Sequence, residues 1–195
     1  MKTLLITAAA VAALSATAAS AQTIDPQWYV RGDVGGTFSS RIDGNSGARS
    51  DGGWAVDVGV GRSLGTGFRA EGEALYLDGK GKSGSADIQT TGALLNGYYD
   101  FLPGTAWQPY VGAGVGVAQV RTSGGTIAPH GNDTRFAYQF KVGVSHPFND
   151  RLTGDLAYRY LGVNDIRIGA GANAVRGTYD TSAITVGLRY KIGGF

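Results

Sequence analysis

Apolar residues recur at every second position along most of the chain. Between residues 28 and 38 the even positions carry Trp28, Val30 and Phe38, whereas the odd positions carry charged side chains such as Arg31. A period of two is typical of a β-strand with one apolar and one polar face. The same alternation returns in seven further stretches: residues 54–60, 68–76, 93–101, 107–117, 136–144, 152–160 and 184–192. The sequence therefore predicts eight strands.

The connections between these stretches fall into two alternating classes. Three are short and contain Gly, Pro, Asn or Asp residues suited to tight turns, and they cover residues 64–67, 102–106 and 147–151. Four are long and polar, and they cover residues 39–53, 78–89, 122–134 and 163–178. Short turns at one end and long loops at the other are typical of outer-membrane barrels. We therefore predict an all-β fold, an eight-stranded antiparallel up-and-down transmembrane β-barrel with four long extracellular loops.

Charged residues in the predicted strands occupy the parity opposite to the apolar residues. A charge facing lipid at the bilayer midplane costs about 2–4 kcal/mol for Arg or Lys, so the charged parity is predicted to face the lumen. The predicted lumenal charge network has equal numbers of acids and bases: Asp33, Asp57, Glu71, Glu73, Asp100 and Asp155, with Arg31, Arg69, Lys141, Arg159, Arg189 and Lys191. Because an eight-stranded barrel is only wide enough for its own side chains, these pairs are predicted to close the lumen.

Aromatic residues gather at both ends of the predicted strands. Outer-membrane barrels carry aromatic girdles at the two membrane interfaces. The girdle predicted at the short-turn ends contains Trp28, Phe68, Phe101, Trp107, Phe148 and Tyr190. The girdle predicted at the loop ends contains Phe38, Trp54, Tyr76, Phe136, Tyr160 and Tyr179.

Composition narrows the function classes. Glycine supplies 33 of 195 residues, well above the usual ~7%, and apolar residues supply 43%, which is too many for a disordered chain. The inward glycines are predicted to make room for side chains from the opposite wall, the alternative being a small ligand or water cavity: Gly59, Gly61, Gly112, Gly114, Gly116, Gly143 and Gly187. The formal charge is +2 and basic residues are scattered, so no nucleic-acid partner is predicted. With no Cys and two His, neither a metal site nor a cofactor is predicted.

The first 21 residues differ from the rest of the chain. Lys2 precedes an apolar run from Leu4 to Leu14, and residues 19–21 (Ala-Ser-Ala) have the small side chains of a signal-peptidase site. We predict that residues 1–21 are a cleaved signal peptide and residues 22–195 the outer-membrane β-barrel domain of a Gram-negative protein. The alternative is a membrane anchor, for which the apolar run is shorter than the ~20 residues that a spanning helix needs.

Two groups of side chains contain parts of a hydrolase site. His130 with Asp133 and Ser123 loosely resembles the group of a lipid A palmitoyltransferase barrel, and His146 next to Ser145 resembles the pair of a lipid A deacylase. The spacing supports neither resemblance strongly. The sequence therefore predicts no catalytic residue and no enzyme, with a lipid A modifying barrel as the alternative.

Three segments resemble the opacity-protein-like family of small outer-membrane surface antigens, porin-like barrels of the eight-stranded OmpA type. They are residues 28–35 (WYVRGDVG), 109–116 (PYVGAGVG) and 158–161 (YRYL). The resemblance implies outer-membrane lipid, lipopolysaccharide and the outer-membrane assembly machinery as partners. Phe195 resembles the terminal aromatic that this machinery reads, but it has the opposite parity to residues 184–192, so either a bulge at Gly193-Gly194 restores the register or the signal is imperfect.

The family resemblance leaves the activity open, because the family includes adhesins, structural antigens and heme-binding proteins. We predict a non-enzymatic surface antigen that contributes to envelope structure and makes surface contacts through its long loops. The alternative is an adhesin or a barrel that binds a small ligand such as heme.

Overall fold

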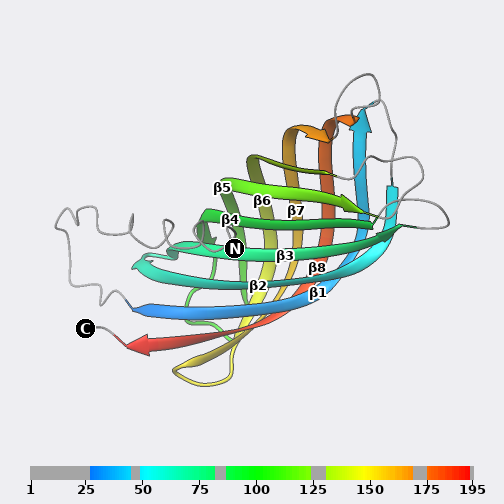
Figure 1. Cartoon of the computed structure of the whole chain (residues 1–195). Helices are drawn as coiled ribbons and strands as arrows, with labels where there is room; N and C mark the ends of the chain where they lie inside the picture. The colour runs from blue at the N-terminus through cyan, green and yellow to red at the C-terminus, as the bar shows by residue number, and fades with distance from the viewer. Residues whose placement is uncertain (1–26, 45–48, 82–86, 124–130, 169–174, 194–195) are drawn as a thin grey trace.

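The computed structural model describes residues 27–44, 49–81, 87–123, 131–168 and 175–193. These residues form one closed antiparallel barrel, in which each strand pairs with the next and β8 pairs with β1 (Figure 1). The strands are β1 (Trp28–Gly44), β2 (Arg49–Gly65), β3 (Phe68–Gly81), β4 (Asp87–Asp100), β5 (Gln108–Ser123), β6 (Gly131–Pro147), β7 (Leu152–Ile168) and β8 (Val175–Gly193). The predicted all-β, eight-stranded fold is confirmed. Among the described residues, no helix is long and apolar enough to span a bilayer.

The barrel wall has the two faces that the alternation predicts. On β1, Val30 and Val34 are exposed, whereas Arg31 and Asp33 between them are buried. Large apolar side chains are exposed on every strand of the barrel. A continuous apolar outer surface is stable against lipid and unstable in water, so the outer wall is the lipid-facing one.

Glycine and asparagine shape the short turns at one end of the barrel. Between β2 and β3, Gly65, Thr66 and Gly67 all have positive φ angles of 83°, 50° and 88°, a conformation that suits glycine and is rarer for threonine. Between β6 and β7, the Asn149 side chain accepts hydrogen bonds from the backbone N–H groups of Arg151 and Leu152. The predicted short turns are therefore where the sequence places them.

The strands extend much further at the other end than the sequence predicts. β1 continues to Gly44 and β2 begins at Arg49, so most of the predicted loop 39–53 is paired strand. β7 and β8 likewise cover most of the predicted loop 163–178. The predicted extent of these loops was wrong, because ladder hydrogen bonds join backbones and persist where apolar alternation stops, as at the pair Ser40 and Ser50.

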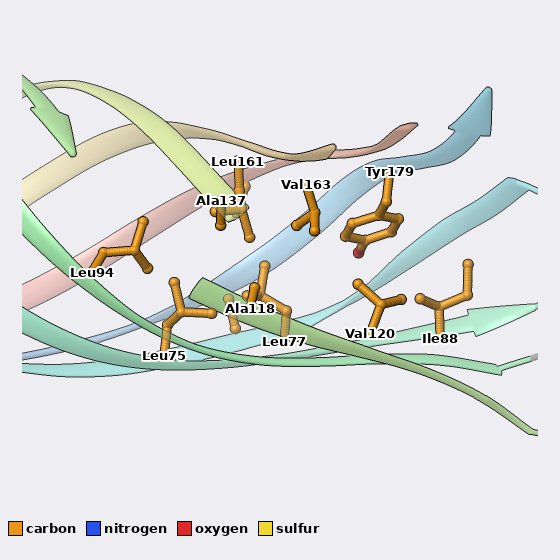
Figure 2. Packing of buried hydrophobic residues seen from close by; sticks show 12 residues of the cluster. Leu75, Leu77, Ile88, Leu94, Ala118, Val120, Ala137, Leu161, Val163 and Tyr179 are labelled. Carbon is orange, nitrogen blue, oxygen red and sulfur yellow. The ribbon is translucent and has the colours of Figure 1, made fainter. Parts of the chain in front are cut away.

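A cluster of buried apolar residues fills the loop end of the barrel (Figure 2). We call it the outer plug, and it consists of Ala55, Leu75, Leu77, Ile88, Leu94, Ala118, Val120, Ala137, Leu161, Val163, Tyr179 and Ala183. Its members follow the buried charges along the strands toward the loops: Leu75 and Leu77 come after Glu73 on β3. The sequence analysis predicted only a charged filling and missed this apolar layer, since it placed Tyr179 in a girdle and Ile88 and Val163 in loops.

Candidate functional site

Eleven of the twelve residues in the predicted lumenal charge network are buried, with exposed fractions from 0% for Arg159 to 8% for Asp100. The twelfth, Lys191, is exposed, so its assignment to the closed lumen was wrong. Lys191 lies two residues beyond Arg189 at the short-turn mouth of the barrel. At the mouth, a side chain of inward parity meets water instead of the opposite wall.

Seven of the buried charges form a central network that crosses the lumen: Arg31, Asp33, Asp57, Glu71, Glu73, Lys141 and Arg159. Glu73 on β3 is its hub, because it pairs with Arg31 at 3.2 Å, with Lys141 at 2.7 Å and with Arg159 at 3.1 Å. Its carboxylate also accepts hydrogen bonds from the Asn96 and Gln139 side-chain amides. These contacts join β1, β3, β4, β6 and β7 across the barrel interior.

Charge within the central network is not balanced. Four carboxylates, on Asp33, Asp57, Glu71 and Glu73, face three cations, on Arg31, Lys141 and Arg159. The network therefore depends more on each cation than on each carboxylate. Buried charges persist only where they are paired, so the removal of one cation is the costliest change.

A second layer closes the lumen at the short-turn end. Arg69 donates through two nitrogens to the Asp100 carboxylate, at 2.8 and 2.7 Å. Its guanidinium also lies 4.6 Å from the ring centre of Tyr98 and 5.2 Å from that of Tyr110. The two-nitrogen pairing and the aromatic faces fix the guanidinium in the middle of the barrel. We call Arg69, Asp100, Tyr29, Tyr98 and Tyr110 the tyrosine layer.

Glycines on neighbouring strands make room for the three tyrosine rings. A Cβ atom at Gly61 would overlap the ring of Tyr29, and one at Gly112 would overlap the ring of Tyr98. Gly143 stands in the same relation to Tyr110. At these positions the structure shows the space-filling role rather than the cavity that the sequence left as an alternative. The rings come from the neighbouring strand, so the predicted origin in the opposite wall was wrong. The sequence analysis did not single out the tyrosines, although their inward parity could have shown them.

The remaining inward glycines also lie against side chains or backbone of the neighbouring strand. A Cβ atom at Gly59 would meet the Glu71 carboxylate, and one at Gly187 would overlap Asp33. At Gly114 it would overlap Asn96, and at Gly116 it would overlap the backbone of β4. The charged network and the tyrosine layer therefore fit only because these neighbours have no side chain.

We expect the wild-type protein to give no stable conductance steps in a planar bilayer, because the tyrosine layer, the central network and the outer plug obstruct the lumen in series. Single variants such as Glu73→Gln or Leu77→Ala should remain silent, since each leaves the other layers in place. Single-channel recording tests this expectation. Large, stable steps from the wild type would contradict it.

The predicted aromatic girdles lie on the outer surface with one exception. At the short-turn end Phe68, Phe101, Trp107, Phe148 and Tyr190 are exposed and Trp28 is partly exposed. At the loop end Phe38, Trp54 and Phe136 are exposed, and Tyr76 and Tyr160 are partly exposed. Tyr179 is only 2% exposed and belongs to the outer plug, so its girdle assignment was wrong.

Strand parity explains the position of Tyr179. It has the same parity on β8 as Ala183, which is also buried, so the ring points inward. The neighbouring residue Asp180 has the other parity and accepts a hydrogen bond from the Tyr160 hydroxyl at 2.6 Å. Above the loop-end girdle, polar side chains on the outer face are joined by hydrogen bonds. The Arg121 guanidinium donates to the Gln119 amide oxygen, and the Gln119 amide nitrogen donates to the Thr134 hydroxyl.

The structure separates the two members of one candidate hydrolase pair. Ser145 is buried in the lumen, where its hydroxyl donates to Asp155 at 2.6 Å and accepts from Arg189 at 3.2 Å. His146, the next residue, faces outward, and its Nδ1 donates to the carbonyl oxygen of Ala106 at 2.7 Å. Adjacent strand residues point to opposite faces, so this serine and histidine cannot act on one substrate.

Several predicted features fall outside the described residues: the signal peptide at residues 1–21, His130 of the other candidate group, and Phe195. At the described end of β8, the pairing with β1 shifts so that Gly193 stands opposite Trp28 and Lys191 opposite Tyr29. This shift inserts one extra residue, Ile192, into β8. Within the described strands, no three His, Asp or Glu side chains are grouped so that they could hold a metal ion.

The combination of an apolar outer wall, aromatic girdles and a charged lumen is that of a bacterial outer-membrane protein. Residues 6–191 match the family described as outer membrane protein beta-barrel domain. The chain belongs to this family. In such barrels the short turns commonly face the periplasm and the longer loops face outside.

Relatives and solved structures agree with this assignment. The chain is 28% identical to a protein of Rickettsia bellii named "Putative adhesin A1I_01215", over 98% of the chain and 99% of the relative. It is 30% identical to "Putative adhesin RT0816" of Rickettsia typhi, with 98% and 99% coverage. The crystal structure of Neisserial surface protein A is similar in fold, with a TM-score of 0.66 at 19% identity, covering 85% of this chain and 97% of that one.

Proposed function

We propose that this barrel is a non-enzymatic surface adhesin, whose extracellular strand ends make the contacts while the membrane-embedded part serves as a rigid support. The obstructed lumen is the observation that carries the proposal. Ion pairs, tyrosines and the outer plug fill the lumen of the described strands, so we infer that the function belongs to an exposed surface.

The extracellular end is built as a projecting collar. On β1, six residues follow Phe38 of the loop-end girdle before the strand ends at Gly44. At about 3.4 Å per residue and a tilt of about 40°, this length rises about 15 Å above the membrane interface. The outer plug, with Ile88 and Val120 buried in it, supports the collar from inside. A supported collar holds the paired strand ends in a fixed arrangement, which lowers the entropic cost of binding a partner.

The names of the relatives support the same function. Two proteins matched over nearly their whole length carry the name "Putative adhesin", and the chain covers 99% of each. The separation of Ser145 from His146 argues against one of the two residue groups considered for the enzyme alternative. We therefore propose that the protein attaches to a surface and does not modify lipid A.

A cell-adherence assay tests the proposal. A non-adherent Gram-negative strain that expresses the protein should bind cultured animal cells. The same strain without the protein should not bind them. Replacing the hairpin end at residues 121–134 with an Asn-Gly turn should reduce adherence if that end contributes, and the other three ends are replaced in turn. Replacement of the periplasmic turn 147–151 is the matched control and should leave adherence unchanged. Adherence that survives loss of all four ends, or is absent in the wild type, would contradict the proposal.

A further inference from the structure

At the loop end of the barrel, the described strands β6 and β7 do not stay paired. The other seams between neighbouring hairpins are paired as far as at least one of their strands reaches, at Ser50–Gly81, Asp87–Ser123 and Gly44–Gly177. Between β6 and β7 the pairing stops at Ala137 and Val163. β6 begins at Gly131 and β7 continues to Ile168, so residues 131–136 and 164–168 each have one unpaired edge. We call these two edges the open seam.

A bulge on β7 holds the seam open. Val163 stands opposite Tyr179 on β8. Ile166 stands opposite Gly177, so β7 carries one extra residue at this point. Bulges bend a strand and end its pairing, and this one starts at the last residue of β7 that pairs with β6. Residues 131–136 of β6 are paired with β5 throughout, so each edge is fixed in place by its other neighbour.

The backbone groups that face the seam from β6 can be assigned from the turn between β6 and β7. The Phe148 N–H donates to the Leu152 carbonyl oxygen at 2.9 Å, so Phe148 points its backbone groups toward β7. Every second residue of an antiparallel strand faces the same neighbour, and the register of β6 has no shift. Asn132, Thr134 and Phe136 therefore turn their backbone N–H and C=O groups toward the open seam.

The β6 edge is accessible from outside the barrel and not from the lumen. Thr134 and Phe136 are exposed, and Phe136 belongs to the loop-end girdle, so the seam starts at the membrane interface and rises above it. At its base, Ala137, Leu161 and Val163 of the outer plug are completely buried. Residues 131–136 contain no proline, which is one of the devices that shield free edges. Such an edge is a template for an added strand.

We propose, on the basis of the proposed adhesin function, that the open seam binds an extended segment of a protein on the animal cell surface. The segment adds to residues 131–136 as an antiparallel strand. Strand addition gains affinity from main-chain hydrogen bonds and specificity from alternate side chains, which here include the exposed Thr134 and Phe136. A second copy of the chain fits less well. The edges face along the barrel wall, so a strand fixed in another wall cannot lie against them.

Hydrogen exchange of the full chain in detergent micelles, followed by NMR, tests the seam itself. The Arg135 amide faces β5, because it alternates with the amides that face the seam. Without a partner, the Thr134 amide should exchange at least about tenfold faster than the Arg135 amide. Equal protection of the two amides would show a closed seam and overturn the inference.

Adherence of the expressing strain to cultured animal cells tests the partner. Thr134→Pro removes the N–H that faces the seam and keeps the bonds to β5, and proline is tolerated on such an edge. Thr134→Ala is the matched variant, because it loses the same hydroxyl, which accepts from Gln119, but keeps the N–H. It should adhere at least about fivefold better than Thr134→Pro, the factor that one net hydrogen bond contributes. Asn132→Pro repeats the test at a second position, and heat-modifiable gel migration verifies that each variant folds.

The outcomes separate strand addition from adhesion in general. Equal adherence of Thr134→Pro and Thr134→Ala, with an adherent wild type, would overturn the strand addition and leave the adhesin function standing. A wild type that does not adhere would overturn both. Trypsin treatment of the animal cells should abolish adherence, because the partner is a protein. Undiminished adherence to trypsin-treated cells would assign the contact to a glycan or a lipid and overturn the inference.

Discussion

Arg159→Met is expected to lower the free energy of unfolding by about 3–5 kcal/mol, the range observed when one partner of a buried ion pair is removed. Arg159 is completely buried and pairs with Asp57 and Glu73. Without it, the four carboxylates of the central network face only Arg31 and Lys141. Urea titration of the folded protein in lipid vesicles, followed by tryptophan fluorescence, measures the change.

Two variants separate charge imbalance from a general sensitivity to substitution. Arg151→Met removes an exposed arginine and should change the free energy of unfolding by less than about 0.5 kcal/mol. Glu73→Gln should cost less than Arg159→Met, because it removes a charge from the side in excess and keeps an oxygen that accepts hydrogen bonds. An effect of Arg159→Met as small as that of Arg151→Met would contradict the dependence on cations, and so would a larger loss of stability for Glu73→Gln than for Arg159→Met.

Gly112→Val should destabilise the barrel by about 1–3 kcal/mol or more, the usual cost of overpacking. The added Cβ would overlap the Tyr98 ring, whose hydroxyl donates to Glu71 at 3.1 Å and whose face covers Arg69. The ring cannot move away without breaking both contacts. Unfolding midpoints in urea, measured for the single variant and for Gly112→Val with Tyr98→Ala, report the cost and the coupling between the two sites.

Gly97→Val tests whether the loss at Gly112 depends on the inward face. Gly97 precedes Tyr98 on β4, points outward and has no atom within 4 Å of an added Cβ. Its replacement should be neutral, or stabilising by up to about 1 kcal/mol, since valine favours strands and loses less entropy than glycine on folding. If the double variant of Gly112→Val with Tyr98→Ala is no more stable than Gly112→Val alone, the Tyr98 ring is not the obstacle.

Strand parity was enough to predict the barrel and most of its charged interior. Arg31 and Asp33 alternate with Val30 and Val34, and only a two-faced wall can satisfy both sets. The same rule, applied further along β8, places Tyr179 inside beside Ala183. The error at Tyr179 therefore came from assigning it by residue type, as an interfacial aromatic, instead of by position.

Strand parity did not predict the outer plug, the length of the collar or the exposure of Lys191, because these features depend on how the strands are arranged in space. The outer plug draws on inward leucines such as Leu75 and Leu94, which adjoin outward apolar residues in the sequence, so alternation is locally lost. The length of the collar depends on backbone pairing, which polar residues permit as readily as apolar ones. Lys191 obeys parity, but it lies at a mouth whose position the sequence does not mark.

The junction between β1 and β8 has a consequence for how the chain reaches its native state. It joins the two ends of the described chain, so it is the least local pairing in the molecule and the most costly in loop entropy. Arg159 on β7 reaches Asp57 on β2, and Lys141 on β6 reaches Glu73 on β3, only when the sheet has curled shut. An open sheet would leave these ions unpaired in the bilayer. We therefore expect insertion into the membrane and closure of the barrel to proceed together, because the ion pairs stabilise only the closed barrel.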